Sequence, residues 1–147
     1  MRRLQDLAIL PVVLEAWITL CLVCVHVIVI GRNRVFANLQ MLPEDEPAAP
    51  PAAAGEVAAS CRRVRRGLAA AVRRLPWTPS CTLQALVAAR MLGRRRISGV
   101  LLVGVRQDET RAIAAHSWVR AGGLVICGGN AETAFTTLAR YTLEPNG

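Results

Sequence analysis

The segment from residue 75 to residue 127 constrains the fold most, because a sharp helix boundary is followed there by several strongly apolar runs. Residues 76–80 (PWTPS) end a preceding helix, since proline cannot continue it. Ser80 is a suitable N-cap for the next helix, which we expect to begin at Cys81 and to end at Gly93, a suitable C-cap.

Strand-like runs follow that helix. Residues 97–105 (ISGVLLVGV) hold few polar side chains and predict a central strand, and residues 112–120 (AIAAHSWVR) predict a second one. Gly122-Gly123 is a tight hairpin signal, and residues 124–127 begin a third strand. Residues 131–141 fit either a short helix or an irregular closure. A helix packed on a small antiparallel sheet predicts an α+β fold.

The most basic part of the chain precedes this segment. Residues 56–75 predict a helix, because apolar residues recur there at intervals of three and four while arginines cover the other faces. All 18 basic residues are arginines, and the net charge is +8. No base-reading side chains interleave with these arginines, so we expect no nucleic acid partner. A solvated face and a surface for an acidic peptide or protein both fit the pattern.

The N-terminal region is the most ambiguous. Residues 7–30 are almost wholly apolar, and a bilayer span needs about 20 such residues. A span would place Glu15 in the hydrocarbon at a cost of about 2–3 kcal/mol, which favours a core helix or a docking helix over membrane attachment. Residues 32–42 either extend this helix or follow it.

The chain therefore divides into three predicted parts. They are an apolar helical arm over residues 1–42, a Pro/Ala-rich linker over 43–55 and a core over 56–147. The five cysteines lack the spacing of a disulfide scaffold, which predicts reduced thiols in a cytoplasmic protein. The C-x-x-C of Cys21 and Cys24 lies in the apolar run without a second pair, so we expect no metal site and no cofactor.

Cys81 and His116 are candidates for a nucleophilic pair. Free N–H groups and the positive end of the dipole at a helix N-terminus favour a thiolate at Cys81. His116, on the second predicted strand, meets Cys81 if the helix packs across the sheet. The backbone N–H of Cys81 is a natural oxyanion donor, and Trp77 or Gln84 could add another. The alternatives are a small buried thiol and a structural histidine.

The group that would orient the histidine is the least well defined member of this predicted site. If Gly122-Gly123 forms a two-residue turn, His116 faces Gly129 across the hairpin. No aspartate follows His116, and the nearby side chains able to accept its N–H are those of Asn130 and Glu132. Asn130 reaches the histidine only if the strand has a bulge or ends early.

These residues resemble the transglutaminase-like cysteine peptidases of lasso-peptide biosynthesis. The family pattern is a cysteine-led helix, a strand ending in G-V-R and the sequence A-H-A-W-V. The matching stretches are residues 75–77 (LPW), 81–86 (CTLQAL), 101–106 (LLVGVR) and 115–119 (AHSWV). Residues 14–16 (LEA) and 34–37 (RVFA) resemble the N-terminal helical arm of the family. The resemblance covers nearly the whole chain and is strongest over residues 75–119.

The resemblance implies a leader peptidase with a transglutaminase- or papain-like core. Such an enzyme removes the leader from a ribosomally made precursor, and an asparagine-synthetase-like cyclase then closes the macrolactam. Cys81 carries over as the nucleophile and His116 as the general base. The aspartate of the family falls near Cys127 or Gly128, where this chain has none. Either Asn130 replaces it, or the triad is reduced to a dyad.

The resemblance also implies partners. Family members occur fused to a winged-helix-like leader-recognition domain or alone, and residues 1–74 lack the strand pattern of that domain. The chain therefore resembles the stand-alone form, which needs a separate recognition protein to present the leader. The apolar arm and the arginine-rich helix are candidate docking surfaces for that protein.

Overall fold

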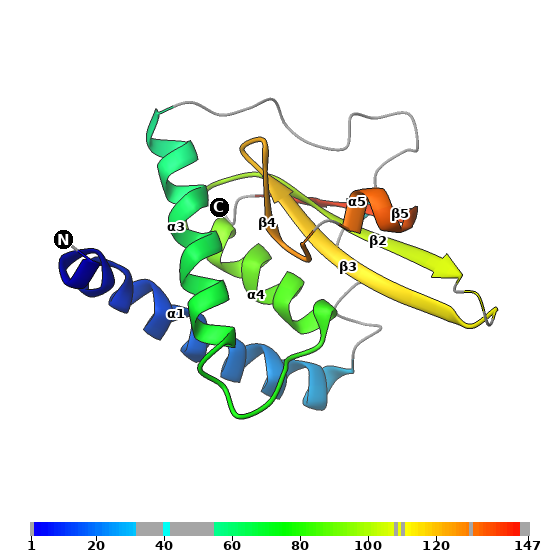
Figure 1. The fold of residues 1–147 in the computed structure, drawn as a ribbon, viewed down its shortest axis with the longest axis horizontal. Coiled ribbons are helices and arrows are strands. Elements are labelled where there is room, and N and C mark those ends of the chain that lie inside the picture. The colour runs from blue at the N-terminus through cyan, green and yellow to red at the C-terminus, as the bar shows by residue number, and fades with distance from the viewer. Residues whose placement is uncertain are drawn as a thin grey trace.

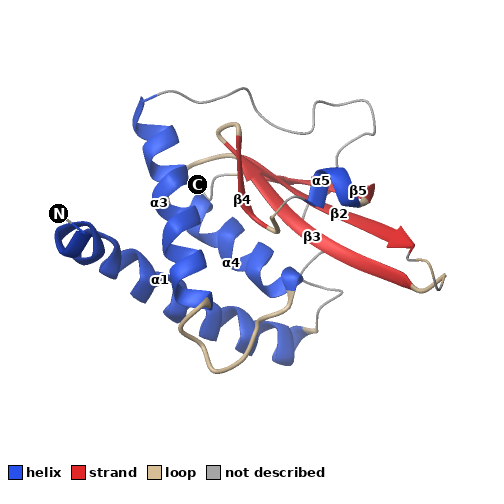
Figure 2. Ribbon diagram, in the orientation of Figure 1, coloured by secondary structure: helices blue, strands red, loops and turns tan. Residues whose placement is uncertain are grey.

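The computed structural model describes residues 2–31, 40–41, 55–107, 109, 111–129 and 131–144. In chain order the elements are α1 (Arg2–Ile30), β1 (Gln40–Met41), α3 (Gly55–Val72), α4 (Cys81–Gly93), β2 (Gly99–Gln107), β3 (Ile113–Ala121), β4 (Leu124–Cys127), α5 (Ala131–Ala134) and β5 (Thr136–Leu143). Figures 1 and 2 show the long helices gathered on one side of a twisted antiparallel sheet. The predicted α+β class is confirmed.

The sheet has the strand order β1-β5-β2-β3-β4, with antiparallel neighbours throughout. The prediction of a helix or irregular closure over residues 131–141 was wrong for most of its length. The helix α5 stops at Ala134, and β5 then pairs with β2 inside the sheet. Residues 32–39 and 42–54, which include nearly all of the predicted linker, lie outside the described residues, and Gln40–Met41 form a strand where a helix was expected.

The helices form two layers below the sheet. α3 and α4 contact strands β3 and β4, whereas α1 packs on α3 and α4 (Figure 1). One core joins these layers, and its fully buried members include Val23, Cys61, Val64, Val87, Met91, Leu92, Leu101 and Val119. α1 and α3 approach closely, because a Cβ added to Gly67 would lie 2.5 Å from Val12 Cγ1. Trp17 Nε1 also donates a hydrogen bond to the carbonyl of Ala71 at 3.1 Å.

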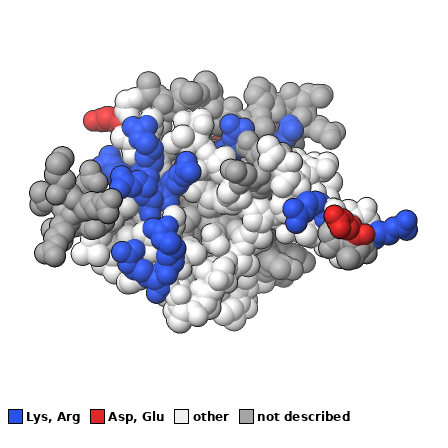
Figure 3. Space-filling view, viewed as in Figure 1, with Lys and Arg blue, Asp and Glu red and all other residues white. Residues whose placement is uncertain are grey.

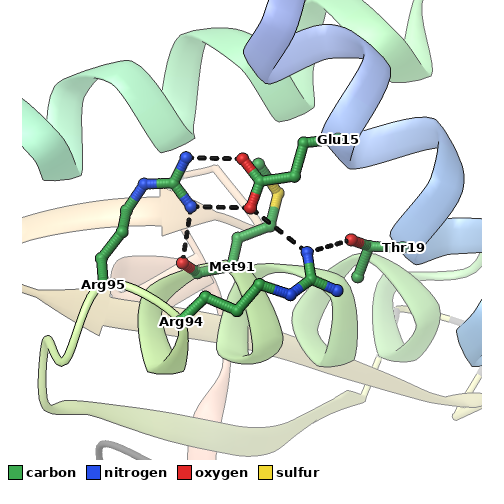
Figure 4. A network of polar contacts seen from close by, with 5 residues as sticks. All are labelled: Glu15, Thr19, Met91, Arg94 and Arg95. Carbon is green, nitrogen blue, oxygen red and sulfur yellow. Dashed lines mark hydrogen bonds and ion pairs between the residues drawn. The ribbon is translucent and has the colours of Figure 1, made fainter.

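Arginines at the end of α4 fasten it to α1 (Figure 4). Arg95 forms a two-pronged ion pair with Glu15, at 2.8 Å and 2.5 Å. Arg94 contacts Glu15 at 3.2 Å and donates to Thr19 Oγ1 at 2.8 Å. The predicted helix over Cys81–Gly93 is confirmed, and its C-cap is Arg94, one residue after the predicted Gly93. The chain turns away from the helix through Arg96, which has a positive φ of 54°.

α1 buries one side and exposes the other. By length and composition Ile9–Ile30 could cross a membrane, a property shared by core helices and signal sequences, and 28% of that stretch is buried here. The buried side carries Val13, Ala16 and Leu20, each at most 4% exposed. The exposed side is also apolar, and its large members are Leu10, Leu14, Ile18, Leu22, Val25, Ile28, Val29 and Ile30.

Candidate active site

Cys81 is the first residue of α4, as predicted. Ser80 caps the helix, because its side-chain oxygen accepts a hydrogen bond from the backbone N–H of Leu83 at 3.3 Å. Gln84 donates from Nε2 to the carbonyl of Pro79 at 2.8 Å and so fixes the turn that precedes the cysteine. Cys81 itself is half-buried and lies at the end of the helix where free N–H groups collect.

The start of α4 lies against β3 and the end of β4. Thr82 Oγ1 is 3.5 Å from the hydroxyl of Ser117, the residue that follows His116. The pKa of the Cys127 thiol is raised to about 12, mainly by burial and also by the nearby Cys81, against the lowering effect of a hydrogen bond from the backbone of Val119. Cys127 therefore stays a neutral thiol at physiological pH, and only Cys81 of this neighbouring pair is partly exposed to solvent.

His116 is held by a backbone carbonyl and two aromatic rings. Its Nε2 lies 2.9 Å from the carbonyl oxygen of Gly128. Because a carbonyl oxygen only accepts, Nε2 must carry the proton, which leaves the lone pair on Nδ1. The imidazole stacks on Phe135 at 5.1 Å and on Trp118 at 6.4 Å between ring centroids. In the neutral ring this contact therefore selects the tautomer whose basic nitrogen is Nδ1.

An irregularity in the hairpin places Gly128 beside Trp118, the strand neighbour of Ser117 and of His116 beyond it. The β3–β4 register shifts between Val119 and Arg120, so that Val119 faces Cys127 while Arg120 faces Val125. The shift moves the chain by one residue, and it corrects the prediction that Gly129 would face His116. A Cβ at Gly128 would lie 2.3 Å from the Trp118 Cβ, and its φ is +95°, so only glycine fits here.

Cys81 and His116 approach the end of β4 from opposite faces of the sheet, and among the described residues no hydrogen bond joins them. Cys81 neighbours Cys127, and His116 binds the next residue, Gly128. The His116 ring lies on the side of β3 that carries Trp118 and Phe135, while Ser117 faces α4.

The other predicted site residues are Trp77, Gln84 and Asn130. Trp77 lies in the loop before α4 and is 56% exposed. The amide nitrogen of Gln84 is occupied by the carbonyl of Pro79. Asn130 lies outside the described residues, as does the side chain of Glu132. Phe135 was not predicted as a site residue, although an aromatic residue soon after Gly128-Gly129 was a signal for it. The guanidinium carbon of Arg106 lies 5.1 Å from the centroid of the Phe135 ring.

These features define an α+β domain with a cysteine at the start of a helix and a histidine on a neighbouring strand. Comparison with protein families matches residues 21–140 to the transglutaminase-like superfamily. The chain belongs to that superfamily, whose members are generally catalytic cysteine enzymes. Comparison with curated proteins and with solved structures finds no significant match.

Proposed function

We propose that this chain is a cysteine peptidase that removes the leader from a lasso-peptide precursor. The observation that carries the proposal is the capped, cysteine-led helix α4, which packs on β3, the strand that also carries the Gly128-bound His116. Membership of the transglutaminase-like superfamily supports cysteine chemistry of the peptidase or acyltransferase type. The lasso-peptide role rests on the resemblance of residues 75–119 to the leader peptidases of that pathway.

The proposed mechanism begins with transfer of the Cys81 proton to His116 Nδ1. The sulfur attacks the scissile carbonyl, and the backbone N–H of Cys81 stabilises the oxyanion. The imidazolium returns the proton to the leaving amine, which becomes the new N-terminus of the core peptide. Water, deprotonated by His116, then hydrolyses the thioester and releases the leader with a free carboxylate.

This mechanism requires His116 Nδ1 and the thiol to come within about 3 Å of each other in the substrate complex. Hydrogen bonds between catalytic groups are often long without substrate and tighten when it binds. The contact with the Gly128 carbonyl already selects the tautomer with a basic Nδ1. Because the ring lies on the face of β3 opposite α4, the required change is a movement of the ring past the end of β4 toward the sulfur. In this scheme a separate recognition protein presents the leader in the cytoplasm, and a cyclase uses the freed amine.

Mass spectrometry of a precursor incubated with this chain and its recognition partner tests the proposal. We expect Cys81→Ala and His116→Ala each to lower leader cleavage by about 1,000-fold or more, as for other catalytic nucleophiles and bases. Cys21→Ala, which removes an exposed cysteine on α1, is the matched control and should cleave normally. Full cleavage by Cys81→Ala would refute the proposal.

The same spectra separate two other functions of this site. A leader product that carries an added amine in place of the free carboxylate would show acyl transfer, which the superfamily also allows. Unchanged precursor that still binds the wild-type chain would show a non-catalytic scaffold of the maturation complex.

A further inference from the structure

A groove opens between α3 and the edge strand β4. Its volume is about 390 Å³, which lies within the usual range of about 300–1,000 Å³ for ligand pockets. One wall is helical and the other is formed by the backbone of the hairpin and its exit. The lining residues are Arg65, Leu68, Ala69, Gln84, Gly123, Leu124, Val125, Ile126, Cys127, Gly128 and Gly129.

The groove ends at the candidate active site. Gln84 lies one turn after Cys81 on α4, Cys127 neighbours the Cys81 thiol, and Gly128 binds His116. A chain lying in the groove would thus have one end beside the nucleophile. Among the residues that line the groove, Gly128 is the one with a role in the proposed chemistry.

The β4 wall offers backbone groups for pairing. Among the strands that the structure describes, β4 is the last of the sheet, and it pairs with β3 on one side only. Ala121 and Leu124 flank the two-residue Gly122-Gly123 turn, so they form the hydrogen-bonded pair of the hairpin. The N–H and C=O of Val125 therefore point away from β3, toward the groove that Val125 lines. An extended peptide is the ligand that satisfies such an edge.

The α3 wall offers positive charge. Arg65 lines the groove and is exposed, and it is the one charged residue among the described lining residues. Figure 3 shows basic side chains gathered over α3 on the viewed face. The exposed arginines on α3 are Arg62, Arg63, Arg65 and Arg66. This charge favours a peptide with acidic side chains.

We infer that the groove binds an acidic, extended stretch of the precursor as an added strand along β4. The backbone of the peptide pairs with Val125, an acidic side chain of the peptide meets Arg65, and the scissile bond lies at Cys81. The inference rests on the proposed function, since it names the substrate side of the same site. It predicts that the peptide N–H groups needed for binding recur at every second residue, because alternate N–H groups of an added strand face β4.

Fluorescence anisotropy tests the groove without requiring cleavage. The full-length Cys81→Ala chain is titrated into a labelled synthetic peptide that spans an acidic leader–core junction. We expect Arg65→Glu to weaken binding about five- to tenfold at low salt. The matched control is Arg63→Glu, which reverses the same charge on the same helix but lies about 200° away around it, and it should change binding less than twofold.

Backbone N-methylation of the peptide, one residue at a time, provides a second measurement on the unaltered groove. We expect alternate positions to weaken binding, because each of those methyl groups removes a hydrogen bond to β4. Equal effects of Arg65→Glu and Arg63→Glu, uniform effects of N-methylation, or no saturable binding up to about 1 mM peptide would each overturn the inference. Binding with the expected pattern but no cleavage by the wild-type chain would leave the inference standing and refute the proposed peptidase.

Discussion

A backbone carbonyl binds His116, and in the proposed mechanism it takes the role of a side-chain carboxylate. In triads of this kind the third group fixes the tautomer of the histidine and stabilises the imidazolium. The Gly128 carbonyl can perform the first task, since it accepts from Nε2 at 2.9 Å. A carbonyl has a dipole but no negative charge, so it stabilises the imidazolium less than an aspartate would. The stacked rings of Phe135 and Trp118 restrict the imidazole further.

Substitution of Gly128 by alanine tests this arrangement. The new Cβ would lie 2.3 Å from the Trp118 Cβ, at a backbone φ of +95°, so the carbonyl must move. We expect Gly128→Ala to lower the free energy of unfolding by about 1–3 kcal/mol and leader cleavage at least tenfold. Urea unfolding measures the first effect, and initial cleavage rates across a range of pH measure the second.

Gly129→Ala is the control for that substitution. Gly129 also has a positive φ, of +63°, but a Cβ there meets nothing within 4 Å. We expect a loss of about 1 kcal/mol in stability from the left-handed conformation alone, with cleavage retained. If both variants lost cleavage equally, the carbonyl of Gly128 would have no special role in positioning His116.

The residues of the site were predictable from the sequence to different degrees. Cys81 and its Ser80 cap follow from local rules, because a proline-rich break precedes a cap residue. The Gly128 carbonyl did not follow, since it depends on a register shift in the hairpin. A one-residue shift leaves the apolar pattern of a four-residue strand almost unchanged, so the pattern could not reveal it.

At the scale of elements, an acidic residue in an apolar helix joins α1 to α4. The charge of Glu15 was the reason to disfavour a bilayer span. In the structure this charge forms ion pairs with Arg94 and Arg95. The hydrogen bond from Arg95 is the largest influence that lowers the pKa of Glu15 below its ordinary value of 4.5, against partial burial. The same pairing raises the pKa of Arg95.

Glu15→Gln should destabilise the fold in a pH-dependent way. The lowered pKa means that the ion pair stabilises the folded chain fully above pH 4.5, the ordinary pKa of the group, and loses that contribution as pH falls through the folded pKa. We expect a loss of about 1–2 kcal/mol at pH 7, allowing for partial exposure of the arginines. The difference between variant and wild type should shrink below pH 4.5.

Chemical denaturation at several pH values measures this difference. Glu109→Gln is the control, because Glu109 is exposed in the turn between β2 and β3, and it should cost little at any pH. A Glu15→Gln deficit that stayed constant down to pH 3 or so would show that packing, and not the ion pair, is responsible.

The bounds of the strands show which of them could be predicted from sequence patterns alone. The predicted strand at 112–120 agrees with β3 to within one residue at each end, since apolar and β-branched residues concentrate there. The strand β5 was missed, because Phe135, Leu138 and Tyr141 have the spacing of a helix face. Pairing with β2 decides the conformation of that segment, and this contact is distant in sequence.

At the scale of the whole molecule, α1 is built into the protein on one side only. Its buried side belongs to the common core, and its middle is tied by Trp17 to α3 and by Glu15 to the arginines just after α4. Its other side leaves a stripe of eight large apolar side chains exposed, and apolar surface gathered on one face marks sites of interaction. Such a stripe favours contact with another apolar surface, whether detergent, lipid or protein.

Polar substitutions on that stripe separate the two sides of α1. Leu14, Ile18 and Leu22 are each 53–54% exposed, and glutamine keeps helix propensity at these positions. We expect the triple glutamine variant to keep its unfolding free energy within about 1 kcal/mol, because little buried surface changes. It should also lose self-association and liposome binding, measured by light scattering and by co-sedimentation.

The control for this prediction is a single glutamine on the buried side of the same helix. Leu20 is 4% exposed, so Leu20→Gln leaves a cavity and an unpaired amide and should cost about 2–5 kcal/mol. If the triple variant instead unfolded like Leu20→Gln, the exposed side of α1 would be part of the core. If it kept its fold and still bound liposomes as strongly as wild type, the contact with lipid would come from the other exposed apolar residues of α1 or from the arginines of α3, and not from these three positions.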